Sequence, residues 1–362
     1  MTSPLISFVV PCYKLAHYLD QCVKSILNQS YQNLEILIMD DCSPDKTPEV
    51  ASAYRDTRVR YLRNEINLGH LRNYNKGINA AKGDYIWLIS ADDCLLATDI
   101  VERYVRMMEG NPQASFIFCP AMGMDCDGNN IGLIDWTRPF DSDRLLRRPE
   151  FLATLAIGNC VSAPSGMVRR ICYESAGAFP PDLPHCGDWF LWCMFALHGD
   201  VAYFCEPMVS YRLHDAAMSS QMKKSIVLDD QAKVRWRVKA MAGDAGFDHI
   251  VEKFTYYLAK HYAFDFAINT PDSGPEEFVR SIETILQQEP NNQERVAMRV
   301  LIYTILADAL YGLGNLASAE YFYHRSLRFG GPQWKCVIKL LLMKTGRLGM
   351  IVRKGFLRLN RG

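Results

Sequence analysis

The sequence of 362 residues lacks the glycine-rich motifs with which many α/β proteins bind phosphate. No G-x-x-x-x-G-K-[ST] occurs, and no G-x-G-x-x-G follows the first apolar run, which ends in Pro11-Cys12-Tyr13-Lys14. These absences argue against a P-loop enzyme and against a Rossmann dehydrogenase. A phosphate ligand would need another means of binding, and a divalent metal held by acidic residues is one.

Zinc motifs and an excess of charge are missing as well. None of the twelve cysteines belongs to a C-x-x-C pair or to a Cys/His cluster with zinc spacing, and they are scattered through apolar runs as buried thiols are. Basic and acidic residues number 40 each, so nothing in the charge balance calls for nucleic acid as a partner. A reducing cytoplasm is the simplest location for such a chain.

The N-terminus shows no signal-peptide pattern, and the sequence suggests no apolar run long enough to span a bilayer. We therefore expect a cytoplasmic protein that is either soluble or attached to the inner face of the membrane.

Apolar residues make up 49% of the chain and charged residues 22%, which is typical of a globular protein. Short apolar runs alternate with helical patterns over the first ninety residues, which predicts a mostly parallel, Rossmann-like α/β sheet flanked by helices. The predicted strands are continuously apolar, as strands buried on both faces are. They cover Ile6–Pro11, Glu35–Asp41, Val59–Arg63 and Asp84–Ser90, with helices at Ala16–Asn28, Thr47–Arg55 and Leu71–Ala81.

The pattern changes along the rest of the chain. Further strands are expected at 114–119, 130–136, 201–205 and 208–213, a loop at 138–149 and a helix at 188–197. From about Lys223 only helical patterns occur, so the C-terminal region is predicted to be all-α. We predict a catalytic domain at 1–220, a helical accessory domain at 221–332 with one tetratricopeptide-like hairpin, and a basic amphipathic tail at 333–362.

Polar residues follow three of the predicted strands. Pro11-Cys12-Tyr13 follows the first, Asp40-Asp41 the second and Ser90-Ala91-Asp92-Asp93 the fourth. Ligands of open α/β sheets bind beyond the carboxyl ends of the strands. Asp and Ser are also common in turns and helix caps, which is the competing explanation for Ser43, Asp45 and Asp93. Two acidic pairs are better explained by a cation, because adjacent carboxylates repel each other.

The order and spacing of several motifs resemble family 2 glycosyltransferases, over roughly residues 4–220. The resemblance rests on residues 7–47 and 81–93, on Asn64-x-x-Asn67-Leu-Gly with Leu71-Arg-Asn, on Cys186-Gly-Asp-Trp and on Tyr211-Arg-x-His214. It implies a GT-A fold, a nucleotide-sugar donor, a divalent metal (Mn²⁺ or Mg²⁺) and inversion at the anomeric carbon.

The resemblance also implies roles for individual residues. Pro11 and Tyr13 would contact the nucleotide base, and Asp41 would accept a hydrogen bond from it. Ser90 and Ala91 would also belong to the nucleotide-binding residues. Asp92 lies at the position of the family's metal ligand, and Asp188 at that of the catalytic base. His214 would close over the diphosphate or reach the metal, with a structural histidine as the alternative. Arg72 would face the phosphates, although an arginine in a helix is more often solvated.

Two positions depart from the family's pattern. The family's Asp-x-Asp-Asp is Ser90-Ala91-Asp92-Asp93 here, so a hydroxyl replaces the first carboxylate, which contacts the sugar or ribose. The usual Glu-Asp pair is Gly187-Asp188. The expected metal ligand and base are kept, and the residues that contact the donor sugar change.

We therefore predict a metal-dependent hexosyltransferase acting on a UDP-sugar and on a glycan or lipid-linked acceptor, in polysaccharide or glycolipid biosynthesis. A nucleotidyltransferase and a non-catalytic nucleotide-sugar binder are the alternatives. Residues 333–362 carry eight basic residues and no acidic residue beside an apolar stripe, which favours a peripheral membrane contact. A helix packed on the domain, with solvated charges, is the alternative.

Overall fold

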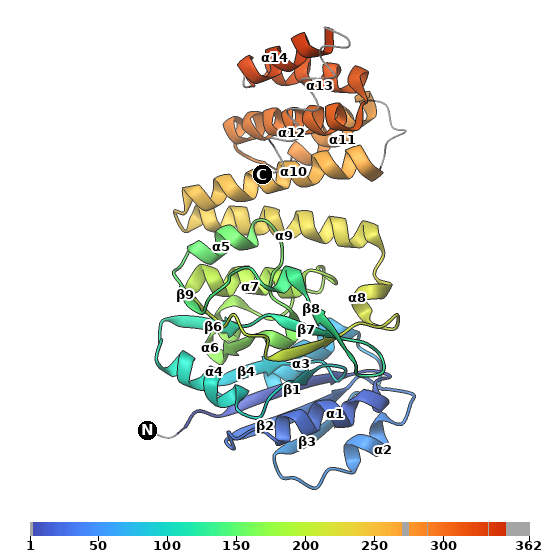
Figure 1. Cartoon of the computed structure of the whole chain (residues 1–362), viewed down its shortest axis with the longest axis vertical. Coiled ribbons are helices and arrows are strands. Elements are labelled where there is room, and N and C mark those ends of the chain that lie inside the picture. Colours follow the sequence, from blue (N-terminus) through green and yellow to red (C-terminus); the bar gives the residue numbers. More distant parts are fainter. Residues whose placement is uncertain (1–2, 270–274, 288, 332, 345–362) are drawn as a thin grey trace. The chain divides into compact units, whose positions relative to one another are not determined.

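Figure 1 shows the computed structural model, which describes residues 3–269, 275–287, 289–331 and 333–344. The chain divides into two compact units, Met1–Ile250 and Val251–Gly362. Helix α9 (Lys224–Asp244), which follows the expected boundary at 220, packs on helix α7 (Gly187–His198) of the first unit. The guanidinium of Arg235 in α9 lies 4.7 Å from the centre of the Trp189 ring. The functional division into three domains stays a proposal.

Within its described residues, the first unit contains an eight-stranded sheet in the order β3-β2-β1-β4-β10-β6-β11-β9. The first four strands are parallel, as are β6 and β11, whereas β10 and β9 are antiparallel to their neighbours. The predicted mostly parallel α/β fold is confirmed. The strands are β1 (Ile6–Cys12), β2 (Leu34–Asp40), β3 (Val59–Arg63), β4 (Tyr85–Leu88), β6 (Ala114–Phe118), β9 (Arg144–Leu146), β10 (Met167–Arg169) and β11 (Asp200–Tyr203).

A smaller sheet lies beside the end of β4. It contains β5 (Cys94–Leu95), β12 (Val209–Arg212), β7 (Ala121–Met124) and β8 (Asn130–Leu133), in that order. The pairing of β12 with β5 aligns Ser210 with Cys94, which brings the segment after Asp93 next to Arg212. Residues far apart in the sequence therefore meet at the carboxyl ends of the main strands.

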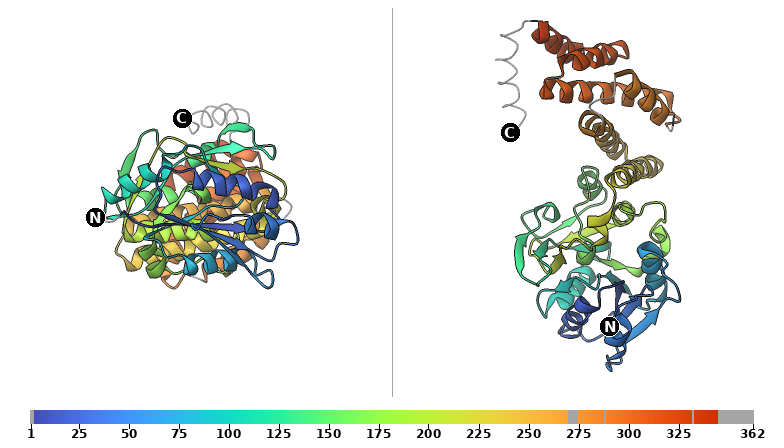
Figure 2. Two further views of the ribbon diagram at one scale, coloured as in Figure 1. Left: turned by 90° about the horizontal axis from the view of Figure 1, so that it is seen from below. Right: turned by 90° about the vertical axis from the view of Figure 1, so that its right-hand side faces the viewer.

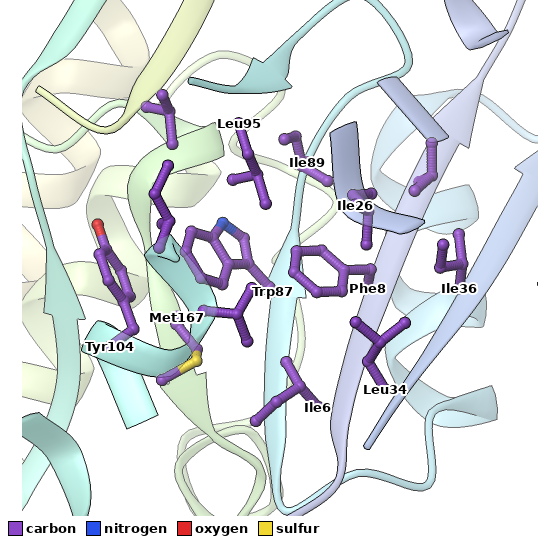
Figure 3. Packing of buried hydrophobic residues seen from close by; sticks show 14 of the residues in the cluster. Ile6, Phe8, Ile26, Leu34, Ile36, Trp87, Ile89, Leu95, Tyr104 and Met167 are labelled. Carbon is purple, nitrogen blue, oxygen red and sulfur yellow. The ribbon is translucent and has the colours of Figure 1, made fainter. Parts of the chain in front are cut away.

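Helices cover both faces of the main sheet (Figures 1 and 2). On one face, α1 (Ala16–Leu27) and α4 (Ile100–Glu109) close a core in which Trp87 stacks on Phe8 and on Tyr104, with ring centres 5.3 and 4.5 Å apart (Figure 3). On the other face lie α3 (His70–Ala80), α5 (Glu150–Leu155) and α7, where Trp192 stacks on Phe116. Aromatic packing on both faces fixes the strands whose ends form the site.

Helix α3 approaches the sheet closely at Gly77. A Cβ atom at this position would lie 2.4 Å from Cγ1 of Val9 and 2.9 Å from Cγ of Met39. The glycine thus lets α3 press against β1 and β2, and this contact sets the position of the N-terminal end of the helix.

Several elements, most of them short, differ from the expectations. Strands β5, β7 and β10 and helices α4, α5 and α6 (Arg170–Ala176) have no counterpart among the predicted elements, and β9 lies inside the segment expected to be a loop. Elements of two to seven residues contain too few positions to display a periodicity, so pairing and packing decide them.

The described residues of the second unit are helical, as expected. Its elements are most of α10 (Asp248–Asn269) together with α11 (Pro275–Leu286), α12 (Asn292–Leu313), α13 (Leu316–Arg328) and α14 (Gln333–Lys344). Helices α12 and α13 form a hairpin that turns at Gly314, whose φ is +88°, and at Asn315, whose side chain accepts a hydrogen bond from the Ser318 amide. Tyr303 and Phe322 stack across the hairpin.

Helix α12 corrects one expectation. The most apolar 18-residue stretch of this 22-residue helix has a mean hydropathy of 1.6, so by length and composition the helix could span a bilayer. The sequence analysis expected no run of this kind. The helix packs against α11 and α13, with side chains such as Ile302 and Leu306 fully buried. One helix with these properties is weak support for a membrane span, because the core helix of a soluble domain shares them.

Candidate functional site

Two cavities, of about 590 and 430 Å³, lie at the carboxyl ends of the main strands. They are called the larger and the smaller cavity below. Both are lined by Ser90 and Asp92 after β4, by His70 and Tyr74 of α3, and by Ala217 and Met218 at the start of α8 (Met218–Gln221). They are therefore neighbouring parts of one site.

The smaller cavity is lined by residues at the ends of β1 and β2, including Pro11, Tyr13 and Asp41. Tyr13 is 41% exposed, so its side chain is accessible to a planar ligand that could stack on it. Lys14 and Cys42 have φ values of +61° and +59°, a left-handed conformation that costs energy for residues with a Cβ. Both strands thus turn sharply where this cavity begins.

The Asp41 carboxylate is held by the loop before α3. Its Oδ1 accepts hydrogen bonds from the side chain of Asn64 and the amide of Leu68, both at 2.8 Å, and its Oδ2 accepts one from the amide of Gly69 at 3.0 Å. A carboxylate can accept about four hydrogen bonds, so capacity for one ligand donor remains. Sequence reasoning assigned Asp41 to the base alone and missed its part in shaping the loop.

Asp92 lies between the two cavities. Its Oδ2 lies 3.0 Å from Nε2 of His214, whereas its Oδ1 is buried without a hydrogen-bond partner among the described residues. A buried carboxylate oxygen without a donor is rare and suits a cation ligand. No group of three His, Cys, Asp or Glu side chains in the described part of the chain could hold a metal. Two protein ligands nevertheless fit a divalent ion that takes its other ligands from phosphates and water.

Arg212 anchors the segment that carries Asp92, a role that sequence reasoning missed. Its side chain donates hydrogen bonds to the carbonyls of Asp92 and Asp125 and to Gln21, while its amide donates to Oδ1 of Asp93. Burial and the neighbouring Asp92 raise the pKa of Asp93 well above its usual range. The sequence motif Tyr211-Arg-x-His214 includes Arg212, but the sequence analysis assigned a role to His214 alone.

Asp188 lines the larger cavity from the first turn of α7. Its Oδ2 accepts a hydrogen bond from Nδ2 of Asn159 at 3.0 Å, and its Oδ1 accepts one from the amide of Trp189 at 2.7 Å. Burial raises the pKa of Asp188 to about 6, although both hydrogen bonds oppose the rise. A carboxylate with this pKa is ionised at neutral pH and still basic enough to take a proton.

Two expected nucleotide contacts are placed differently. Ala91 is fully buried, and its amide donates to the carbonyl of Pro11, so its part is to join β1 to the segment after β4. Arg72 is exposed on α3 and lines neither cavity. The structure brings the other expected residues together: Pro11, Tyr13, Asp41, Ser90, Asp92, Asp188 and His214.

Comparison with known proteins identifies the family. A profile described as "Glycosyl transferase family 2" matches residues 7–170. An uncharacterized glycosyltransferase of Haemophilus influenzae is 35% identical over 233 residues, which cover 63% of this chain and 86% of the relative. The chain belongs to glycosyltransferase family 2. It is accordingly a glycosyltransferase, as the sequence analysis predicts.

Two further comparisons, one with a curated protein and one with a solved structure, also find similarity. The abequosyltransferase RfbV of Salmonella typhimurium is 35% identical over 130 residues, or 34% of this chain and 38% of that protein. Among solved structures, Staphylococcus aureus TarS 1-349 in complex with UDP-GlcNAc aligns with a TM-score of 0.63 over 90% of this chain and 92% of TarS 1-349. The sequence identity to TarS is 16%, so this likeness establishes the fold.

Proposed function

We propose that this glycosyltransferase is inverting and metal-assisted, and that it moves a hexose from a UDP-sugar to a hydroxyl of a glycan or lipid-linked acceptor. One observation carries the proposal: Asp92 and Asp188 line the same cavity. A transferase of this kind needs one carboxylate near the diphosphate and another near the attacking hydroxyl. A non-catalytic nucleotide-sugar binder would have no use for the second.

The smaller cavity suits the nucleotide. Tyr13 offers an exposed ring for stacking, Asp41 has capacity for one more hydrogen bond, and Ser90 provides a hydroxyl between the two cavities. TarS was crystallised with UDP and with UDP-GlcNAc, which supports UDP as the nucleotide of this chain. The larger cavity then receives the donor sugar and the acceptor.

Asp92 and His214 would hold a divalent metal, Mn²⁺ or Mg²⁺, together with the diphosphate. Such an ion stabilises negative charge on the leaving diphosphate as a Lewis acid. The unpartnered Oδ1 of Asp92 supports this assignment. Arg212 holds the backbone of Asp92 by a hydrogen bond to its carbonyl, so that the carboxylate is already oriented when the donor binds.

Asp188 acts as the general base. It takes the proton of the acceptor hydroxyl as that oxygen attacks the anomeric carbon, while the bond from this carbon to the diphosphate oxygen breaks. Attack from the side opposite the leaving group inverts the configuration. A neutral hydroxyl is a poor nucleophile, and proton transfer to a positioned base is worth about 10²–10⁴-fold in rate.

A panel of nucleotide-sugars, incubated with the chain and a mixture of acceptor glycans, tests this proposal. We expect release of the nucleoside diphosphate with one donor, and an NMR spectrum of the product should show the inverted anomeric configuration. Formation of a nucleoside triphosphate and a sugar 1-phosphate when pyrophosphate is added would instead indicate the nucleotidyltransferase alternative. Binding without turnover for every donor and acceptor would indicate the non-catalytic binder.

The acceptor's pathway and location are proposals as well. We propose a cytoplasmic enzyme of polysaccharide or glycolipid biosynthesis that reaches a lipid-linked acceptor at the inner face of the membrane. The expected tail, 333–362, lies only partly within the described residues, because the basic and apolar side chains from Arg347 to Arg361 fall outside them.

A further inference from the structure

Helix α14 carries apolar side chains on two sides. Cys336 and Leu340 are 0% and 8% exposed, and they belong to the side that packs on α13. A second set, spaced as i, i+3, i+4 and i+7, shares another face of the helix. This set, called the outer face of α14 below, consists of Trp334, Val337, Ile338 and Leu341, which are 65%, 43%, 43% and 58% exposed.

The outer face differs from the scattered apolar residues that any protein surface has. Four neighbouring large side chains, one of them a tryptophan, lie within about two turns of a single helix. No described residue covers them. A face of this kind on a globular domain marks a surface that binds something apolar.

The charge around the outer face identifies its partner. Lys335 is exposed beside it, with its ammonium group 5.2 Å from the centre of the Trp334 ring. Residues 333–362 contain eight lysines and arginines and no aspartate or glutamate. Lys339 of the same helix is paired with Asp308 of α12, whereas the segment itself carries no carboxylate. Apolar and tryptophan side chains on such a basic segment complement an anionic lipid surface, where tryptophan prefers the interface and lysine the headgroups.

We propose that the outer face of α14 docks the chain on an anionic bilayer surface, with Trp334, Val337, Ile338 and Leu341 entering the interface. The helix lies flat, since its opposite side is occupied by α13. This inference rests on none of the catalytic residues, so its failure would leave the proposed reaction untouched. Its consequence is a higher local concentration of enzyme at lipid-linked acceptors.

Sedimentation of the full chain with vesicles tests the proposal. We expect the chain to pellet with phosphatidylcholine vesicles that contain phosphatidylglycerol, and not with phosphatidylcholine alone. Trp334→Ser with Leu341→Ser should lower the binding by about tenfold or more, because binding scales with the apolar area inserted. The matched control is Leu313→Ser with Leu316→Ser, which removes two apolar side chains that are 66% and 38% exposed at the α12–α13 turn. It should bind as the unmodified chain does.

Brominated lipids give a second readout. Their quenching of tryptophan fluorescence should require Trp334, so Trp334→Phe should keep the sedimentation and lose most of the quenching. The proposal would be overturned if the Trp334/Leu341 and Leu313/Leu316 double variants bound the anionic vesicles equally well. It would also be overturned if the unmodified chain stayed in the supernatant with these vesicles at low salt. A dimer in solution that the Trp334/Leu341 pair alone converts to monomer would overturn it as well, because the outer face would then serve a second copy of the chain.

Discussion

The pKa of Asp188 is set by two opposing effects, burial that raises it and hydrogen bonds that lower it. Because the folded-state pKa lies above the ordinary value, the ionised carboxylate costs folding free energy; this cost develops as the pH rises from about 3.8 to about 6 and is constant at higher pH. A site that keeps a destabilising charge at neutral pH is typical of catalysis.

Asp188→Asn should therefore lose activity without losing stability. We expect turnover to fall by about 10²-fold or more, since an amide cannot take the acceptor's proton. Melting at pH 8 should occur at the same temperature or higher, because the buried charge is gone. Nucleotide binding should be retained. Near-normal turnover would remove Asp188 from the role of base.

Asn159 provides a separate test of the same carboxylate. Its side-chain amide donates to Oδ2 of Asp188 and so favours the ionised form. Asn159→Ala should move the acidic limb of the turnover–pH profile to higher pH, with a larger loss at pH 6 than at pH 8. Asn129→Ala, which removes an exposed asparagine bonded to Asp125, is the control and should leave the profile in place. An unshifted limb in Asn159→Ala would mean that another group limits the rate.

The proposed role of Asp92 as a metal ligand predicts that turnover depends on a divalent metal. Turnover should stop in chelator and return with Mn²⁺ or Mg²⁺, and Asp92→Ala should weaken UDP binding by about tenfold or more while leaving uridine binding unchanged. Calorimetry with the two ligands measures this difference, and uridine serves as the control within one variant. Full turnover of the unmodified chain in chelator would refute the metal assignment.

At the scale of elements, the main strands were the easiest to predict. β1, β2 and β4 are buried on both faces, so their sequences are continuously apolar, and polar residues follow directly where they end. The spacing of motifs then indicated Asp92 and Asp188. What the sequence could not show was the side-chain network: Asp41 holding the loop to Gly69, or Arg212 reaching from β12 to Asp92. Such contacts join segments that only the folded sheets bring together.

The distance between helix α3 and the main sheet depends on Gly77. Gly77→Ala places a methyl group against Val9 and Met39, and overpacking of this kind costs about 1–3 kcal/mol. Asn79→Ala, on the exposed side of the same helix, introduces the same residue without the contact and should leave stability unchanged or slightly raised. Urea unfolding of both variants measures the difference, and equal midpoints would show that α3 is not tightly seated.

At the scale of the whole molecule, every residue that lines the two cavities belongs to the first unit. The lining residues run from Pro11 to Arg235, and they come from both sheets, from α3 and α7, and from α9. Helix α9 thus contributes to the catalytic unit although it follows the last strand. The second unit has its own core, in which Tyr303, Phe322 and Tyr323 are fully buried.

This division predicts that a fragment of residues 1–250 folds and keeps the chemistry. It should show a cooperative thermal transition, bind UDP within about twofold of the full chain and transfer sugar to a soluble acceptor, because no lining residue has been removed. The same fragment should stay in the supernatant with anionic vesicles, since α14 is absent. Circular dichroism establishes folding before either assay is interpreted. A folded fragment that fails to bind UDP would show that the second unit takes part in the site. A fragment that still pellets with the vesicles would place the membrane contact in the first unit.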